Sequence, residues 1–133
     1  MEIIRVVING ALGKMGREIT KAVDSEPEMK IVGALEKEVS QQYFALPETL
    51  ELVPFSSKMG SLLKKCSPDV VVDFTNAEAS MAAVRIVLKQ KVNIVIGTTG
   101  LSEGNLAEIS ELCQAYEVGA IVAPNFSLGA ALL

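Results

Sequence analysis

Short aliphatic runs alternate with amphipathic stretches along most of the chain. The runs are rich in Val and Ile, which is typical of strands that are covered on both faces in a parallel sheet. Between the runs, apolar residues recur at helical spacing, and turn residues separate the two kinds of segment. The predicted strands are Ile3–Ile8, Lys30–Leu35, Asp69–Phe74, Asn93–Ile96 and Val118–Val122, and the predicted helices are Lys14–Ser25, Lys58–Lys64, Glu78–Gln90 and Ser102–Tyr116.

The segment from residue 38 to residue 56 has the weakest pattern. Pro47 and Pro54 limit regular structure there, and residues 41–43 show no clear period. We predict a loop region that contains one short strand, Val53–Phe55.

This order of strands and helices predicts an α/β fold. Helices that join parallel neighbouring strands by right-handed crossovers produce an open, doubly wound parallel sheet with helices on both faces, a three-layer αβα arrangement. The pattern of residues 127–133 predicts the opening turns of an apolar helix, and a natural domain seldom ends on an uncapped apolar stretch. We therefore expect one domain over residues 1–126, followed by the start of a connection to a second domain.

Composition and charge narrow the range of functions. With 133 residues, 50% of them apolar and 21% charged, the chain fits one ordinary globular domain. Twelve Lys and Arg residues against sixteen Asp and Glu residues give a net charge of −4, which argues against nucleic acid or an anionic membrane as partner. Because the chain has no histidine, it has neither a Ser-His-Asp triad nor a zinc site with histidine ligands, and we expect no metal.

The N-terminal residues lack the charged, apolar and small-residue order of a signal peptide. No apolar stretch approaches the roughly 20 residues of a membrane span. We expect a cytoplasmic protein.

A glycine-rich loop follows the first predicted strand. It reads G-x-x-G-x-x-G, with Gly10 suited to the tight turn, Gly13 to a close approach of phosphate groups, and Gly16 to close packing of helix and strand. A helix that starts there directs its amide groups and positive end at an anion. This is the pyrophosphate site of a Rossmann-type fold, although the usual fingerprint has glycine at the position of Ala11. The alternative is that the glycines only make a strand-to-helix turn.

Glu36 and Lys37 end the second predicted strand. Glu36 stands 20 residues beyond Gly16, where a carboxylate accepts hydrogen bonds from the hydroxyl groups of an adenosine ribose. The carboxylate would repel the extra phosphate of NADP, whereas Lys37 would attract it. The pair suggests NAD with some tolerance of NADP, unless the two residues are merely a solvated strand end.

Polar segments also follow the three later strands. They are 73–76, 97–100 and 123–127. In an open parallel sheet, ligands bind beyond the carboxyl ends of the strands, so we expect these segments to share a crevice with the glycine loop. Each segment alone is an ordinary turn, and Thr75 or Ser127 is equally suited to cap a helix.

The motifs G-A-L-G-K-M-G-R, D-F-T, G-T-T-G and P-N-F-S-L-G occur in this order and span the whole chain. Their combination resembles the cofactor-binding domain of the 4-hydroxy-tetrahydrodipicolinate reductases, also called dihydrodipicolinate reductases. The resemblance implies NADH or NADPH as cofactor and a small dicarboxylate substrate on the diaminopimelate route to lysine.

The resemblance also implies roles for individual residues. It places the pyrophosphate on Gly10, Ala11, Leu12, Gly13, Lys14 and Met15, the ribose on Glu36, and a 2′-phosphate near Lys37. It places the nicotinamide and its ribose along Gly97, Thr98 and Thr99, with Ala123, Pro124, Asn125 and Phe126 closing around the ring, and Phe74 and Thr75 in the same crevice.

The family's catalytic histidine and lysine belong to an E-x-H-H-x-x-K-x-D-x-P-S-G-T segment in a second domain. This chain contains no such segment, so the resemblance implies a chain that binds cofactor but carries no catalytic residue of its own. Substrate binding and assembly into a homotetramer are also implied to depend largely on the second domain.

Two alternatives stay open. One is the first half of another two-domain dehydrogenase, such as a relative of aspartate or homoserine dehydrogenase, although the G-T-T-G and P-N-F-S segments speak against it. The other is a stand-alone nucleotide-sensing module whose output is a conformational change.

Overall fold

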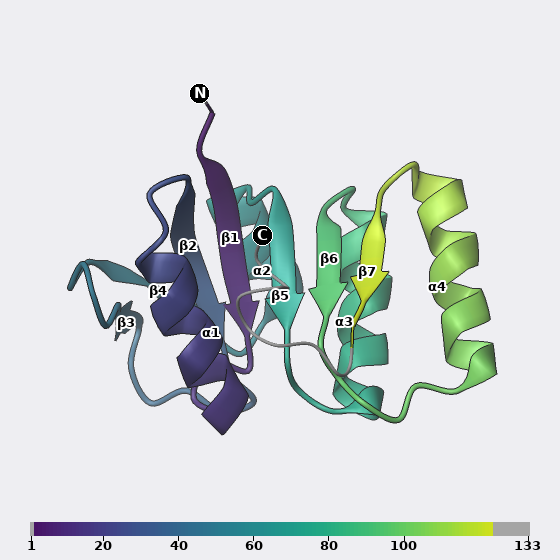
Figure 1. Cartoon of the computed structure of the whole chain (residues 1–133), viewed down its shortest axis with the longest axis horizontal. Coiled ribbons are helices and arrows are strands. Elements are labelled where there is room, and N and C mark those ends of the chain that lie inside the picture. The colour runs from purple at the N-terminus through teal and green to yellow at the C-terminus, as the bar shows by residue number, and fades with distance from the viewer. Residues whose placement is uncertain (1, 124–133) are drawn as a thin grey trace.

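The computed structural model describes residues 2–123, which form one mixed sheet with helices on both faces (Figure 1). Along the sheet the strands follow the order β3-β4-β2-β1-β5-β6-β7. Among the described residues, no helix is long and apolar enough to cross a membrane. The elements are β1 Ile4–Asn9, α1 Lys14–Asp24, β2 Met29–Leu35, β3 Tyr43–Ala45, β4 Leu52–Ser56, α2 Met59–Cys66, β5 Val70–Asp73, α3 Ala77–Lys89, β6 Asn93–Ile96, α4 Glu103–Tyr116 and β7 Ala120–Val122.

All neighbouring strands from β4 to β7 pair in parallel. Their arrowheads point to one edge of the sheet, the lower edge in Figure 1. The chain builds β1, β2 and β4 in one direction and then returns to place β5 on the other side of β1. The point where the direction changes lies between β1 and β5, and Asn9 pairs with Asp73 there. In doubly wound sheets this is the position at which ligands bind.

The predicted parallel strands and helices are confirmed, with ends that shift by no more than two residues. The predicted strand Val53–Phe55 is β4, which is one residue longer at each end. The sequence prediction was wrong about β3, which was assigned to a loop. This short strand pairs antiparallel with β4, so the sheet is not wholly parallel. Three residues beside a proline-containing strand are too few to show a period in the sequence.

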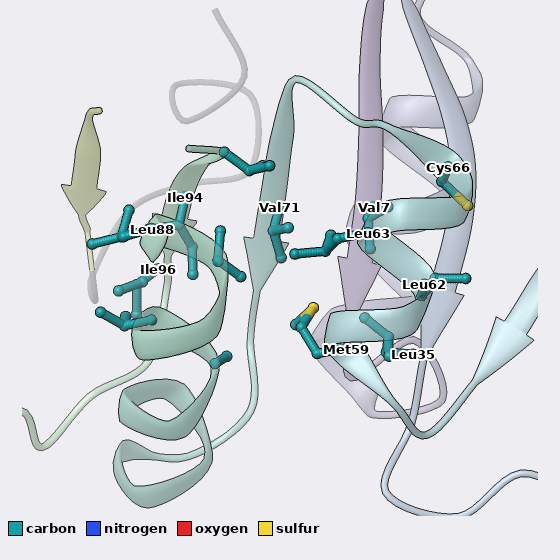
Figure 2. Packing of buried hydrophobic residues seen from close by; sticks show 14 of the residues in the cluster. Val7, Leu35, Met59, Leu62, Leu63, Cys66, Val71, Leu88, Ile94 and Ile96 are labelled. Atoms are coloured by element: carbon teal, nitrogen blue, oxygen red, sulfur yellow. The ribbon is translucent and has the colours of Figure 1, made fainter. Parts of the chain in front are cut away.

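Alternate residues of the central strands belong to two separate hydrophobic cores, because successive side chains of a strand point to opposite faces of the sheet. On one face Val7 and Val71 join residues of α2, α3 and α4. On the other face Val6 and Ile8 join Ile19 of α1 and residues of the β3–β4 region. Figure 2 shows the first core, with the side chains of α2 directed at those of the sheet. The two cores make the three layers and hold the strand ends at fixed positions.

Candidate functional site

The glycine loop is a tight turn that joins β1 to α1. Gly10 has a φ of +87°, in the left-handed region that residues with side chains disfavour. The amides of Gly10 and Ala11 donate to the carbonyl oxygen of Leu35, at 3.0 and 3.1 Å, and this fixes the loop against the end of β2. A Cβ atom on Gly16 would collide with the carbonyl oxygen of Gly10. Gly10 therefore makes the tight turn, and Gly16 allows the close contact between helix and strand. The glycine spacing predicts both.

No side chain caps the N-terminus of α1. Its N-cap residue is Gly13, and its first turn carries no acidic residue. By contrast, Asn76 and Ser102 accept amide hydrogen bonds at the starts of α3 and α4, at 2.9 and 3.0 Å. The first amides of a helix have no acceptor within the helix, so those of α1 can serve an external anion. Together with the positive end of the helix dipole, they are a donor set that suits a phosphate group.

The carboxylate of Glu36 lies beside this loop. Its Oε2 accepts the amide of Leu12 at 2.8 Å, and its Oε1 accepts the amide of Lys37 at 3.0 Å. Glu36 is half-buried, and each of its oxygens retains a further lone pair. The side chain is therefore held in place and can still accept hydrogen bonds from hydroxyl groups of a ligand.

A cleft of about 890 Å³ runs along the carboxyl ends of the adjacent strands β4, β2, β1 and β5. Its size is within the range of small-molecule and cofactor sites, about 300 to 1,000 Å³. Residues of α2 and α3 form its wall. The cleft is lined by Asn9, Gly10, Gly13, Leu35, Glu36, Lys37, Ser57, Lys58, Met59, Gly60, Phe74, Thr75, Asn76, Glu78, Ala79, Ala82, Ala83 and Ile86.

The loops after β5 and β6 are in direct contact at Phe74 and Gly97. A Cβ atom on Gly97 would collide with the ring of Phe74, so the ring lies against the backbone of this glycine. The amide of Gly97 also donates to the carbonyl oxygen of Asp73 at 2.9 Å. The aromatic side chain in the cleft therefore depends on the absence of a side chain at position 97.

Asp73 is the buried acid of the site. Its Oδ1 accepts the amide and the hydroxyl of Thr75, at 2.9 and 2.7 Å. No donor among the described residues reaches its Oδ2. Burial raises the pKa of this carboxyl above its ordinary value of 3.8, and hydrogen bonds, chiefly those from Thr75, oppose the shift.

The structure brings together part of the predicted site. The predicted residues that line the cleft are Gly10, Gly13, Glu36, Lys37, Phe74 and Thr75. Those that do not line it are Ala11 and Thr98, which are buried, Gly97 and Ala123, which are half-buried, and Leu12, Lys14, Met15 and Thr99, which are exposed. Pro124, Asn125 and Phe126, like residues 127–133, lie outside the described residues.

Thr75 does not cap α3. Asn76 is the N-cap residue, and its side chain accepts the amide of Ala79. The alternative of a helix cap at Thr75 is therefore wrong, and its hydroxyl instead bonds to Asp73. The same alternative for Ser127 lies outside the described residues.

Sequence reasoning missed one wall of the cleft. Residues 57–60 and the inner face of α3 line it, and neither was named as a candidate. The first segment was detectable, because it directly follows the predicted strand Val53–Phe55. The second was not, because Ala79, Ala82 and Ala83 look like any packed helix face in a sequence.

The gathered groups are suited to binding. They offer amide donors for an anion, a carboxylate for hydroxyl groups and an aromatic ring. Within residues 2–123, no three Cys, Asp or Glu side chains come close enough together to hold a metal ion.

Comparison with known proteins gives consistent results over nearly the whole chain. The family described as "Dihydrodipicolinate reductase, N-terminus" matches residues 4–126. A 4-hydroxy-tetrahydrodipicolinate reductase of Dehalococcoides mccartyi strain BAV1 is 45% identical over 130 residues, which cover 98% of this chain and 49% of that protein. The chain thus spans about half the length of the curated relatives it matches.

Solved structures agree with these matches. A dipicolinate-bound dihydrodipicolinate reductase from Paenisporosarcina sp. TG-14 superposes with a TM-score of 0.80 and 34% identity, covering 98% of this chain and 50% of that one. A homoserine dehydrogenase of S. aureus reaches a TM-score of 0.76 with only 18% identity, covering 94% of this chain and 33% of that one. The second likeness shows a shared fold alone.

Replacing Gly97 by alanine should destabilise the protein. The new methyl group must displace the ring of Phe74, and such overpacking costs about 1 to 3 kcal/mol. Urea denaturation measures the loss, and ring resonances of Phe74 report the displacement. Gly104→Ala is the control, because that position near the start of α4 has room for a methyl group and should lose no stability. Equal stability of both variants would disprove the close contact at position 97.

The raised pKa of Asp73 should make stability fall as pH rises. Above pH 3.8 the folded state retains a proton that the unfolded state has lost, so the free energy of unfolding decreases until the folded pKa is passed. We expect this decrease in the difference between the wild-type chain and Asp73→Asn, measured by urea denaturation from pH 4 to pH 8. A difference that stays constant or grows with pH would contradict the shift.

Proposed function

This chain belongs to the dihydrodipicolinate reductase family, as the match to its N-terminal domain over residues 4–126 shows, and on that premise we propose that it is the cofactor-binding half of a 4-hydroxy-tetrahydrodipicolinate reductase. The proposed enzyme uses NADH or NADPH to reduce 4-hydroxy-tetrahydrodipicolinate to tetrahydrodipicolinate in lysine biosynthesis through diaminopimelate. It works in the cytoplasm. The observation that carries the proposal is the uncapped start of α1 beside a glycine turn, with Glu36 held next to it.

The glycine loop receives the diphosphate of the dinucleotide in this proposal. The amides at the start of α1 donate to its oxygens, and Gly13 leaves room on the side that lines the cleft. A Cβ atom at Gly13 would have the Gly10 carbonyl oxygen, at 3.5 Å, as its nearest neighbour, so this side of the loop is open. The residues present therefore fit a diphosphate group.

Glu36 binds the adenosine ribose. Its carboxylate is fixed by the amides of Leu12 and Lys37, so little conformational freedom is lost when hydroxyl groups of a ribose bind to it. Lys37 also lines the cleft and is exposed, and it attracts the 2′-phosphate of NADPH. This arrangement supports binding of NADH with tolerance of NADPH.

The nicotinamide end lies toward Phe74, Thr75 and the loop that begins at Gly97. When bound, the nicotinamide supplies the hydride that reduces the substrate. The chain's own residues hold the ring in position and exclude water from it. Ala123, Pro124, Asn125 and Phe126 are proposed to complete this end, and Leu12, Lys14, Met15, Thr98 and Thr99 to act in the loops around it and around the diphosphate.

The proton donor and most of the substrate contacts come from outside this chain in our proposal. The 133 residues contain no histidine, and the catalytic segment expected of the family is absent from them. Residues 1–126 form the cofactor domain and residues 127–133 begin the connection to a second domain. That domain also joins four copies of the full-length enzyme into a tetramer.

The homoserine dehydrogenase alternative has less support. Its likeness is one of fold, at 18% identity, against 34% to 45% for the dihydrodipicolinate reductases. A nucleotide-sensing module has no observation in its favour beyond the cleft itself.

Glu36→Ala should weaken the binding of NADH more than the binding of NADPH. The lost charge-assisted hydrogen bonds are worth roughly 1.5 to 3 kcal/mol, so the dissociation constant of NADH should rise about 10- to 100-fold. NADPH should change little, because the same substitution removes a negative charge that repels the 2′-phosphate. Calorimetric titration of the chain with each nucleotide measures both constants.

Glu38→Ala is the matched control, because this neighbouring carboxylate is exposed and does not line the cleft. It should leave both affinities unchanged. Equal losses of affinity for NADH and NADPH in Glu36→Ala would show that Glu36 does not bind the ribose. Failure of the unaltered chain to bind either nucleotide would refute the proposed function.

A further inference from the structure

A chain of hydroxyl groups leads inward from the buried carboxylate of Asp73. Thr75 Oγ1 lies 2.7 Å from Asp73 Oδ1, Ser80 Oγ lies 3.2 Å from Thr75 Oγ1, and Thr98 Oγ1 lies 2.7 Å from Ser80 Oγ. These residues belong to the end of β5, the first turns of α3 and the loop after β6. This series of hydroxyl groups therefore connects the end of β5 and the start of α3 to the loop after β6, 18 residues beyond Ser80.

The carboxylate sets the direction of this chain. Each hydroxyl group has one proton, and Asp73 Oδ1 already accepts the amide of Thr75, so the short bond to Oδ1 takes the hydroxyl proton of Thr75 as well. Ser80 must then donate to Thr75, and Thr98 must donate to Ser80. Every rotor is fixed once the Asp73 oxygen is in place.

Fixing the rotor of Thr75 also fixes its methyl group, which faces the glycine loop. A Cβ atom on Gly10 would lie 3.0 Å from Thr75 Cγ2 and 3.6 Å from the carbonyl oxygen of Phe74. On the other side, the ring of Phe74 lies against Gly97. The D-F-T turn thus separates the glycine loop from the loop after β6, and its own position depends on Asp73.

Asp73 itself is fully buried and does not line the cleft. Burying a carboxylate whose second oxygen has no donor among the described residues lowers stability. An apolar residue would be better for stability alone, so we look for the benefit of this oxygen acceptor in the geometry that it imposes.

We infer that Asp73 is a positioning residue for the dinucleotide, which acts through Thr75 and Ser80 to keep the glycine loop and the Gly97 loop at the separation that the bound cofactor needs. The inference rests on the proposed function for its ligand. The geometric part, that Asp73 holds both loops in place, does not.

The test compares three variants with one control. Asp73→Ala removes the acceptor at the start of the series of hydroxyl groups. Ser80→Ala interrupts this series of hydrogen bonds at a buried residue outside the cleft. Asp73→Asn retains an oxygen in the place of Oδ1. Cys66→Ala is the control, because its thiol is also buried and bonded, to the carbonyl oxygen of Val32 at 3.1 Å, but lies at the end of α2 away from the cleft.

The first measurement is the NADH dissociation constant by calorimetry of the chain, at a temperature at which all variants are folded. We expect about 10-fold or greater weakening in Asp73→Ala, severalfold weakening in Ser80→Ala and less than about threefold in Asp73→Asn. Cys66→Ala should lose stability without loss of affinity. If Asp73→Ala binds NADH as tightly as the control does, the positioning role is refuted.

The second measurement needs no nucleotide. Amide hydrogen exchange of Gly10 and Gly97 should become faster in Asp73→Ala and Ser80→Ala, because the two loops are no longer held, and should stay slow in Asp73→Asn and Cys66→Ala. Unchanged exchange in the first two variants would overturn the inference. If the unaltered chain does not bind NADH, the proposed function fails, and this exchange pattern still decides whether Asp73 holds the loops.

Discussion

The close backbone contact at Gly10 is the constraint on which the site depends. A side chain at position 16 would collide with the Gly10 carbonyl oxygen, and one at position 10 would crowd the methyl group of Thr75. Because these spaces are empty, α1 can begin directly at the turn and the end of β5 can lie beside it. The two amides bound to Leu35 add the end of β2 to the same junction. The cleft, with Glu36 on one side and Thr75 on the other, follows from this meeting of three strand ends.

Most of the fold could be predicted because the physical signals are local. The sequence shows aliphatic runs for strands that are buried on both faces and a regular apolar period for helices. The parallel arrangement of the strands follows from the alternation of the two. The strand β3 could not be predicted, because its three residues gain their conformation from antiparallel pairing with β4 rather than from any pattern of their own. Tertiary contact, not propensity, decides such a segment.

The candidate site divides in the same way. Gly10, Gly16 and Glu36 were identifiable from spacing, since each answers a requirement of one turn or one strand end. The wall formed by α3 was not, because it depends on how this helix packs against the sheet and α2. Asp73 belongs to a polar segment that the sequence singled out, but the role of Ser80 was not predictable. Ser80 bonds to Thr98, 18 positions further along, and no local pattern reports that contact.

The described residues hold groups that bind and orient a dinucleotide, in a chain about half as long as the reductases it resembles. In our proposal, the diphosphate of the dinucleotide binds to the amides at the start of α1. Addition of NADH to the ¹⁵N-labelled chain, followed by two-dimensional amide spectra, tests it most directly. We expect the largest shifts in residues 10–15 and at Glu36, with saturation at one equivalent. Shifts that are largest elsewhere, or no shifts at millimolar NADH, would contradict it.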